Sequence, residues 1–502
     1  MMWEASEAGA PDLPRWAKAA LAALVAATLV VSWLPTLSWG LWQDETTMAW
    51  QAQAGWAIAR DRLGDPAQSV LFGYIEALFY FPGPHMEAWL RAPAVIGTLA
   101  SLFLVYRLAE MFVGKGSGLL ALVPLAGSPL MLTYSTQARP YSLALAACLV
   151  TLWGVARWLE TRSWRHGLTF AVAFAVAVHL QLLFGIFAVV PAFLIWRRAR
   201  RQQPIAWLQL AAWTGLSALL MLPLVIMLRR LSRFPDPSAV PVPTIADLAD
   251  ALSPSVVLLS LLPFVFLLVP ASVRRRALAG LRGPDIRPPL ALGAFWFVAP
   301  PLLLFVASHL LHKTVLIDRY VLHIVAAQAL IVAALFRVFP PILATLGLLA
   351  CFLPYPVLYG IHSSKRADGL LSWRLPTQTV RALDPTAAAP VFVQSAHPPT
   401  NAIDWQHAIE QRTFFYAQLA AYPLPNRTYP LPYNLDDNVR AYVRHIADTE
   451  LTESPVIFVA GIAKHPTLLW VQRFFEGRGY TSTYGVEKAL WLLVLRRADS
   501  HR

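Results

Sequence analysis

Residues 21–45 read LAALVAATLVVSWLPTLSWGLWQDE, and this stretch decides the class of fold. Its first part is an apolar run long enough to cross the hydrocarbon core of a bilayer as a helix. Its last two residues, Asp44 and Glu45, are adjacent carboxylates at the point where that helix leaves the membrane. The rest of the sequence must decide whether these two acids belong to an ordinary loop or to a working site.

The composition of the whole chain is that of a polytopic membrane protein. Of its 502 residues, 57% are hydrophobic and only 14% are charged, whereas soluble domains are nearer a quarter charged. Apolar runs of spanning length recur as far as Gly360, and we expect about eleven transmembrane helices. Their expected bounds are about 17–38, 92–113, 117–134, 141–159, 167–179, 182–196, 205–228, 254–273, 289–310, 321–338 and 341–360.

The run from Gly167 to Trp196 is divided into two spans for two reasons. As one helix it would be about 45 Å long, against a hydrocarbon core of about 30 Å. His179 and Gln181 also interrupt it midway, and polar groups are costly in lipid. Two short helices that meet near His179 remove both problems.

The net charge of +13 has two explanations. One is a nucleic-acid partner, and the other is the excess of Lys and Arg that membrane proteins carry on their cytoplasmic side. We favour the second, because the arginines sit at the ends of the spans. Eleven spans place most of them on the side of the N-terminus, which predicts a cytoplasmic N-terminus and a C-terminal region outside.

The composition predicts two domains. Residues 1–360 form the transmembrane domain, whose first outer loop, 41–91, carries two helices lying in the plane of the interface. Residues 361–502 contain no spanning run and predict a small extracytoplasmic α/β domain. Within it we expect strands at 389–394, 454–461 and 487–497 and a helix that begins near residue 467.

The predicted topology brings polar side chains from separate loops to the outer face. They are Asp44 and Glu45, the segment STQARPYS (135–142), His179 and Gln181, three arginines after the seventh span, and the segment HKTVLIDRY (312–320). Acids and bases gathered at a membrane surface are what a polar reaction chamber needs. Each residue also has a simpler interpretation: Asp44 as a helix N-cap, Arg139, Lys313 and Arg319 as interfacial anchors, and His179 as a buried histidine with its hydrogen bonds satisfied.

These motifs resemble those of the GT-C integral-membrane glycosyltransferases, especially the bacterial relatives of protein O-mannosyltransferases and aminoarabinose transferases in family 39. The resemblance covers residues 17–360 and rests on WQDE after the first span, YSTQARPYSLALA before the fourth, a His between paired short helices, and DRYVLHIV at a late span. It differs in one place. Many relatives carry a His-Pro-Pro segment in the first outer loop, where this chain has GDPAQSVLFGY.

The resemblance implies a GT-C-like bundle in a bacterial plasma membrane and a sugar donor linked to a polyprenyl phosphate. The acceptor would be a lipid, glycan or protein hydroxyl outside the membrane, and no nucleic acid would take part. A hydroxyl that attacks an anomeric carbon needs a base, and we expect Asp44 to be that base, with Glu45 orienting it or binding the acceptor. The leaving phosphate needs positive charge.

The expected substrate-binding residues are Arg139, Tyr141, His179, Lys313, Arg319 and Tyr320. A single displacement would invert the anomeric centre. No motif points to a metal or cofactor, although an acidic pair could recruit a divalent cation.

Three other functions are compatible with an apolar chain of this kind. A transporter of lipid-linked glycans would need polar residues through the whole bundle, and several spans have almost none. A polysaccharide polymerase or ligase would use outer arginines without an acidic pair after the first span. A membrane anchor for the C-terminal domain would not need eleven spans.

Overall fold

We describe a computed structural model of the chain. It covers residues 13–57, 69–225, 241–252, 271–272, 275, 286–353, 372–397, 400–401, 404–407, 409 and 414–498.

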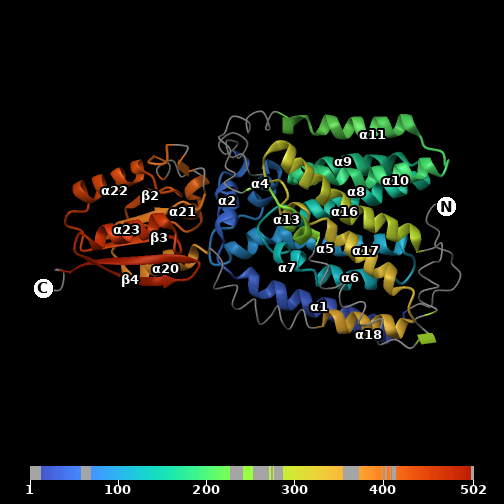
Figure 1. Cartoon of the computed structure of the whole chain (residues 1–502), viewed down its shortest axis with the longest axis horizontal. Coiled ribbons are helices and arrows are strands. Elements are labelled where there is room, and N and C mark those ends of the chain that lie inside the picture. The colour runs from blue at the N-terminus through green and yellow to red at the C-terminus, as the bar shows by residue number, and fades with distance from the viewer. Residues whose placement is uncertain are drawn as a thin grey trace.

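The first part of the chain is a helical bundle (Figure 1). Its helices are α1 (Arg15–Leu37), α2 (Gln43–Ala52), α4 (Val70–Ala77), α5 (Met86–Phe112), α6 (Gly118–Ala126), α7 (Pro129–Tyr134), α8 (Tyr141–Thr161), α9 (Trp164–Leu180), α10 (Val189–Arg200), α11 (Trp207–Leu220), α13 (Ile245–Leu252), α16 (Arg287–Leu311), α17 (Ile324–Phe336) and α18 (Pro341–Phe352). Short 3-10 helices occur at η1 (Gly55–Ala57), η2 (Leu182–Ala188) and η4 (Asp318–Tyr320).

Five helical stretches within the described residues are long and apolar enough to cross a membrane: 15–37, 86–112, 141–161, 182–200 and 287–311. Helices also occupy the other expected spans that the structure describes, although several are shorter than predicted. The expected span at 117–134 is two helices, α6 and α7, which are separated at Gly127 and Ser128. The expected span at 254–273 and the domain boundary near residue 360 lie almost entirely outside the described residues.

The predicted division of the run from Gly167 to Trp196 is present in the structure. Helix α9 ends at Leu180, and Gln181 adopts an extended backbone conformation with φ −152° and ψ 108° before η2 begins. The chain then continues through η2 into α10. The helical path therefore breaks where the polar residues interrupt the apolar run.

Residues 372–498, here called the C-terminal unit, carry a five-stranded sheet in the order β2-β1-β3-β5-β4. Its elements are α20 (Arg374–Leu383), β1 (Val391–Gln394), η6 (Phe414–Tyr416), α21 (Ala417–Ala421), β2 (Thr428–Leu431), α22 (Asp437–Thr449), β3 (Val456–Ile462), α23 (Pro466–Glu476), β4 (Tyr480–Glu487) and β5 (Leu490–Arg497). Strands β2, β1 and β3 are parallel, and β5 is antiparallel to both β3 and β4.

The two faces of this sheet are covered by different parts of the molecule. Side chains alternate between faces along a strand, so Val391 and Val393 lie in one core and Phe392 lies in the other. The core around Phe392 is completed by residues of α22 and α23. The core around Val391 also takes in Leu41 and Ala49 from the first outer loop.

Helix α2 therefore connects the bundle to the C-terminal unit, which lies beyond one end of the bundle (Figure 1). Hydrogen bonds also cross the interface between the bundle and the C-terminal unit. The Trp373 indole N–H donates to Oε1 of Gln43 at 2.8 Å, and the Leu41 amide donates to the hydroxyl of Tyr422 at 2.7 Å. That hydroxyl donates in turn to Glu87 at 3.0 Å.

Candidate active site

Asp44 lies in the first turn of α2, and its carboxylate meets two arginines from distant segments. Its Oδ2 is 3.3 Å from Nη1 of Arg319 and 3.5 Å from Nη2 of Arg139. Arg139 follows α7, and Arg319 belongs to η4. The Asp44 side chain keeps 22% of its surface exposed. Three loops predicted to share one face thus contribute one charged side chain each.

The N-cap interpretation of Asp44 is not what the structure has. The N-cap of α2 is Trp42, whose backbone N–H donates to the carboxylate of Glu45 at 3.2 Å. Asp44 is the second residue of the helix, where a negative charge is still favoured by the helix dipole. Its side chain faces Arg139 and Arg319 instead of closing the helix terminus.

Glu45 is buried, and its carboxylate is fully engaged. Arg91 from α5 binds it in a two-point ion pair, with 2.9 Å from Nε to Oε1 and 2.6 Å from Nη2 to Oε2. The backbone N–H of Ala138 also donates to Oε1 at 2.8 Å. Glu45 therefore connects α2 to α5 and to the loop that carries Arg139.

Arg91 links this ion pair to the end of the first span. Its Nη1 donates to the backbone oxygens of Thr36 and Trp39, each at 2.6 Å. The last carbonyl groups of a helix have no partner within the helix, and a cation there is stabilising. Arg91 and Glu45 together hold the turn between α1 and α2, and that turn fixes the place of Asp44.

Each of the two arginines contacts a tyrosine. Nη2 of Arg139 donates to the hydroxyl of Tyr141 at 2.9 Å, and Nη1 of Arg139 donates to the backbone oxygen of Asp44 at 3.3 Å. The guanidinium of Arg319 lies 5.3 Å from the centre of the Tyr320 ring. The structure thus brings Asp44, Arg139, Tyr141, Arg319 and Tyr320 together.

The other two predicted residues, His179 and Lys313, lie on other elements. His179 lies near the end of α9, and its Nε2 is 2.9 Å from the backbone oxygen of Leu220 at the end of α11. Lys313 is exposed in the turn after α16. The three arginines at 229, 230 and 233 lie outside the described residues.

Sequence reasoning missed Glu76, a buried acid on α4. Neither carboxylate oxygen of Glu76 has a hydrogen-bond partner among the described residues. Burial raises the pKa of Glu76 well above its ordinary value, the charge on Glu45 raises it further, and Arg139 lowers it. The signal was present in the sequence, because Glu76 is the single acid in the apolar stretch SVLFGYIEALFYF.

Several buried polar atoms on the segments of Asp44, Arg139 and Arg319, and one in the C-terminal unit, also lack partners among the described residues. They are Nε1 of Trp42, Nε2 of Gln43, Oγ of Ser135, Oε1 of Gln137, Nε of Arg139, Nε of Arg319 and Nε2 of His397. Buried polar groups in proteins are normally hydrogen-bonded. All of these atoms except Nε2 of His397, which lies in the C-terminal unit, are on the segments that hold Asp44, Arg139 and Arg319. A polar ligand would satisfy such donors and acceptors.

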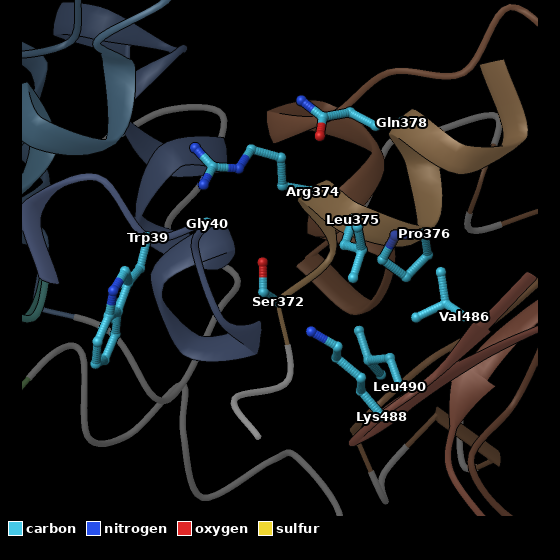
Figure 2. A pocket seen from close by; sticks show the side chains of 10 residues that line it. All are labelled: Trp39, Gly40, Ser372, Arg374, Leu375, Pro376, Gln378, Val486, Lys488 and Leu490. Carbon is cyan, nitrogen blue, oxygen red and sulfur yellow. The ribbon is translucent and has the colours of Figure 1, made fainter. Parts of the chain in front are cut away.

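A hollow lies where the chain just after α1 meets the C-terminal unit (Figure 2). Its volume is about 260 Å³, and its lining includes Trp39, Arg374 and Lys488. Arg374 is already paired with Glu87 at 3.3 Å. This hollow contains none of the predicted site residues and no carboxylate, so we place the candidate active site at Asp44. Within the described part of the chain, no three His, Cys, Asp or Glu side chains gather as a metal site would require.

Comparisons with known proteins give a family match over part of the chain. Residues 68–226 match the family described as Dolichyl-phosphate-mannose-protein mannosyltransferase. The matched range includes Arg139, Tyr141 and His179 but not Asp44 or Arg319. The sequence matched no curated protein.

The fold is shared with solved structures of ArnT from Cupriavidus metallidurans. The apo structure superposes with a TM-score of 0.58 at 10% identity, covering 96% of this chain and 99% of the other. The structure bound to undecaprenyl phosphate gives a TM-score of 0.54 with the same identity and coverage. The family match and the fold together confirm the predicted resemblance to GT-C glycosyltransferases.

Proposed function

We propose that this chain, a membrane glycosyltransferase with the GT-C fold, moves a sugar from a polyprenyl-phosphate donor to an acceptor hydroxyl outside the membrane. The observation that carries the proposal is the meeting of the Asp44 carboxylate with Arg139 and Arg319, among buried polar atoms that lack partners. One acid and two guanidinium groups match the two needs of the reaction: a base for the acceptor and positive charge for the leaving phosphate.

Asp44 acts as the general base. The acceptor hydroxyl attacks the anomeric carbon of the sugar while its proton passes to the Asp44 carboxylate. The bond between the anomeric carbon and the phosphate oxygen breaks, and its electron pair leaves with the lipid phosphate. Because this is a single displacement, the anomeric configuration inverts.

Arg139 and Arg319 bind the phosphate of the donor. A guanidinium group offers paired N–H donors that match phosphate oxygens, and Nε of each arginine has no partner among the described residues. A phosphate bound between the two arginines would compete with Asp44 for their charge. Donor binding therefore frees the carboxylate to act as a base.

Glu45 and Arg91 act as positioning residues in this scheme. Their ion pair is buried, and it holds both the turn before Asp44 and the loop before Arg139. Tyr141 and Tyr320 line the arginines and complete the binding site for the donor phosphate. His179 and Lys313 remain candidates for contacts with parts of the substrate farther from Asp44.

The proposed donor is inferred from the family and the solved structures that this chain resembles. The description of the matched family names dolichyl-phosphate-mannose, and one of the similar ArnT structures contains bound undecaprenyl phosphate. We extend the shared chemistry, a sugar linked through phosphate to a long polyprenol, to this chain. We also propose a bacterial plasma membrane location, a cytoplasmic N-terminus, and residues 361–502 as an extracytoplasmic domain.

The test compares the purified wild type with three variants for binding of undecaprenyl phosphate and for transfer from polyprenyl-phosphate sugars. Arg139→Ala and Arg319→Ala should each weaken binding of the lipid phosphate by at least tenfold and reduce transfer. The matched control is Arg165→Ala, which removes an exposed arginine at the start of α9. Unchanged lipid-phosphate affinity in both site variants would contradict the proposal.

A further inference from the structure

The C-terminal unit contains a histidine whose Nε2 atom is buried and lacks a partner among the described residues. His397 follows the carboxyl end of β1 by three residues, and its imidazole ring packs against Phe414 with 4.4 Å between ring centres. Carboxyl ends of parallel strands are where ligands commonly bind in open α/β sheets. The Nε2 atom of His397 is buried and has no hydrogen-bond partner among the residues that the structure describes.

Charges of the bundle act on this ring. Burial lowers the pKa of His397 to about 4, while Asp44 raises it and Arg139 lowers it further. The ring of His397 also lies 6.1 Å from the ring of Phe415. Phe415 packs against the core that contains Ala49 of α2 and Ala138, the residue before Arg139. At neutral pH its imidazole is uncharged, and it can either donate or accept a hydrogen bond.

The packing of α2 against the C-terminal unit determines where His397 lies relative to the bundle. Asp44 lies on α2, and α2 packs against α21 and into the core on one face of the sheet. Besides the Trp373 and Tyr422 contacts, the side-chain amide of Gln53, at the C-terminal end of α2, donates to the backbone oxygen of Ala420 at 2.7 Å. The helix that carries the base and the unit that carries His397 are thus packed together.

We propose that the C-terminal unit completes the active site, and that Nε2 of His397 binds the acceptor hydroxyl beside Asp44. This inference rests on the proposed glycosyl transfer. In this scheme the donor phosphate binds the arginines of the bundle, and the acceptor binds on the side of His397, which belongs to the C-terminal unit. An unpartnered neutral imidazole next to a carboxylate is suited to hold a hydroxyl while that carboxylate takes its proton.

The test uses substitutions that separate a hydrogen-bonding role from a packing role. A strain without the gene is complemented with full-length variants, and the glycan product lost in the deletion is measured by mass spectrometry. His397→Gln keeps a polar group near the position of Nε2 and should retain product formation within about threefold. His397→Phe keeps the aromatic packing against Phe414 and should lower it about tenfold or more, because one hydrogen bond is lost.

Two controls define the result. His407→Gln changes a histidine that is exposed and paired with Asp404 at 2.8 Å, and it should leave product formation unchanged. Undecaprenyl phosphate should bind the Gln and Phe variants of His397 as tightly as the wild type, since the proposal places His397 on the acceptor side.

Three outcomes would overturn the inference: full product formation by His397→Phe, equal loss in the Gln and Phe variants, or weakened lipid-phosphate binding by His397→Phe. Asp44→Asn is measured in the same strain. Full product formation by that variant would contradict the proposed base, and the comparison of Gln with Phe would still decide the role of His397.

Discussion

Adjacent acids in this chain have different tasks. Asp44 is partly exposed and shares its charge between two arginines, whereas Glu45 is buried and saturated by Arg91 and backbone N–H groups. In a helix, neighbouring residues point in directions about 100° apart. One side chain can therefore face a substrate while the next faces the core.

Replacing Glu45 by Ala should destabilise the protein strongly. The change leaves the guanidinium of Arg91 buried without its partner, and breaking a buried ion pair in this way costs about 3–5 kcal/mol. We expect a large fall in the thermal unfolding midpoint of the detergent-solubilised protein. Asp44→Asn is the matched control one position away, and it should unfold within a few degrees of the wild type. Equal midpoints for Glu45→Ala and the wild type would exclude the positioning role.

At the scale of elements, α4 carries a titratable group that works against the fold at neutral pH. The pKa of Glu76 is raised above its ordinary value of 4.5, mainly by burial. In the unfolded chain this carboxyl releases its proton at a lower pH than it does in the fold. Its contribution to stability is therefore fully present below pH 4.5 and is lost as the pH rises through the folded pKa.

Glu76→Gln removes this pH dependence and should raise the unfolding midpoint at pH 7.5. The gain over the wild type should shrink as the pH is lowered toward 4.5. Thermal unfolding of both proteins across this range measures the difference. A variant that is no more stable than the wild type at pH 7.5 would mean that Glu76 has a partner when the protein is in its membrane.

The elements also show what the sequence pattern can and cannot predict. The break after Leu180 was predictable, because length and the polar pair His179 and Gln181 both point to it. The gathering of Asp44, Arg139 and Arg319 followed from counting spans, which places loops on one face. Strands β2 and β4 were not predicted, since β2 is short and β4 is largely exposed.

The roles of Arg91 and His397 were beyond prediction from sequence for a different reason. In the sequence, Arg91 is indistinguishable from other cations at the ends of spans. Its structural role follows only from its contacts with Glu45 and with a backbone carbonyl of α1. His397 lies far from Asp44 in sequence. Its proposed place in the site depends on how one face of the sheet packs against α2, and no local pattern encodes that packing.

At the scale of the whole molecule, the first outer loop and the C-terminal unit pack together at one end of the bundle (Figure 1). Transfer to an extracytoplasmic acceptor requires that end to lie outside the cytoplasm. Reporter fusions after Arg201 and at the C-terminus should report opposite sides of the membrane, with Arg201 cytoplasmic. Reporters on the same side would contradict the predicted topology and with it the extracytoplasmic acceptor.

The central claim is that Asp44 is the base for glycosyl transfer, and one measurement tests it most directly. Purified wild type and Asp44→Asn are compared for the rate of transfer from the polyprenyl-phosphate sugar, with undecaprenyl phosphate binding measured on the same samples. We predict a rate at least 100-fold lower for the variant, in line with the loss of a general base, with lipid-phosphate affinity retained. A variant that transfers sugar at the wild-type rate would contradict the account.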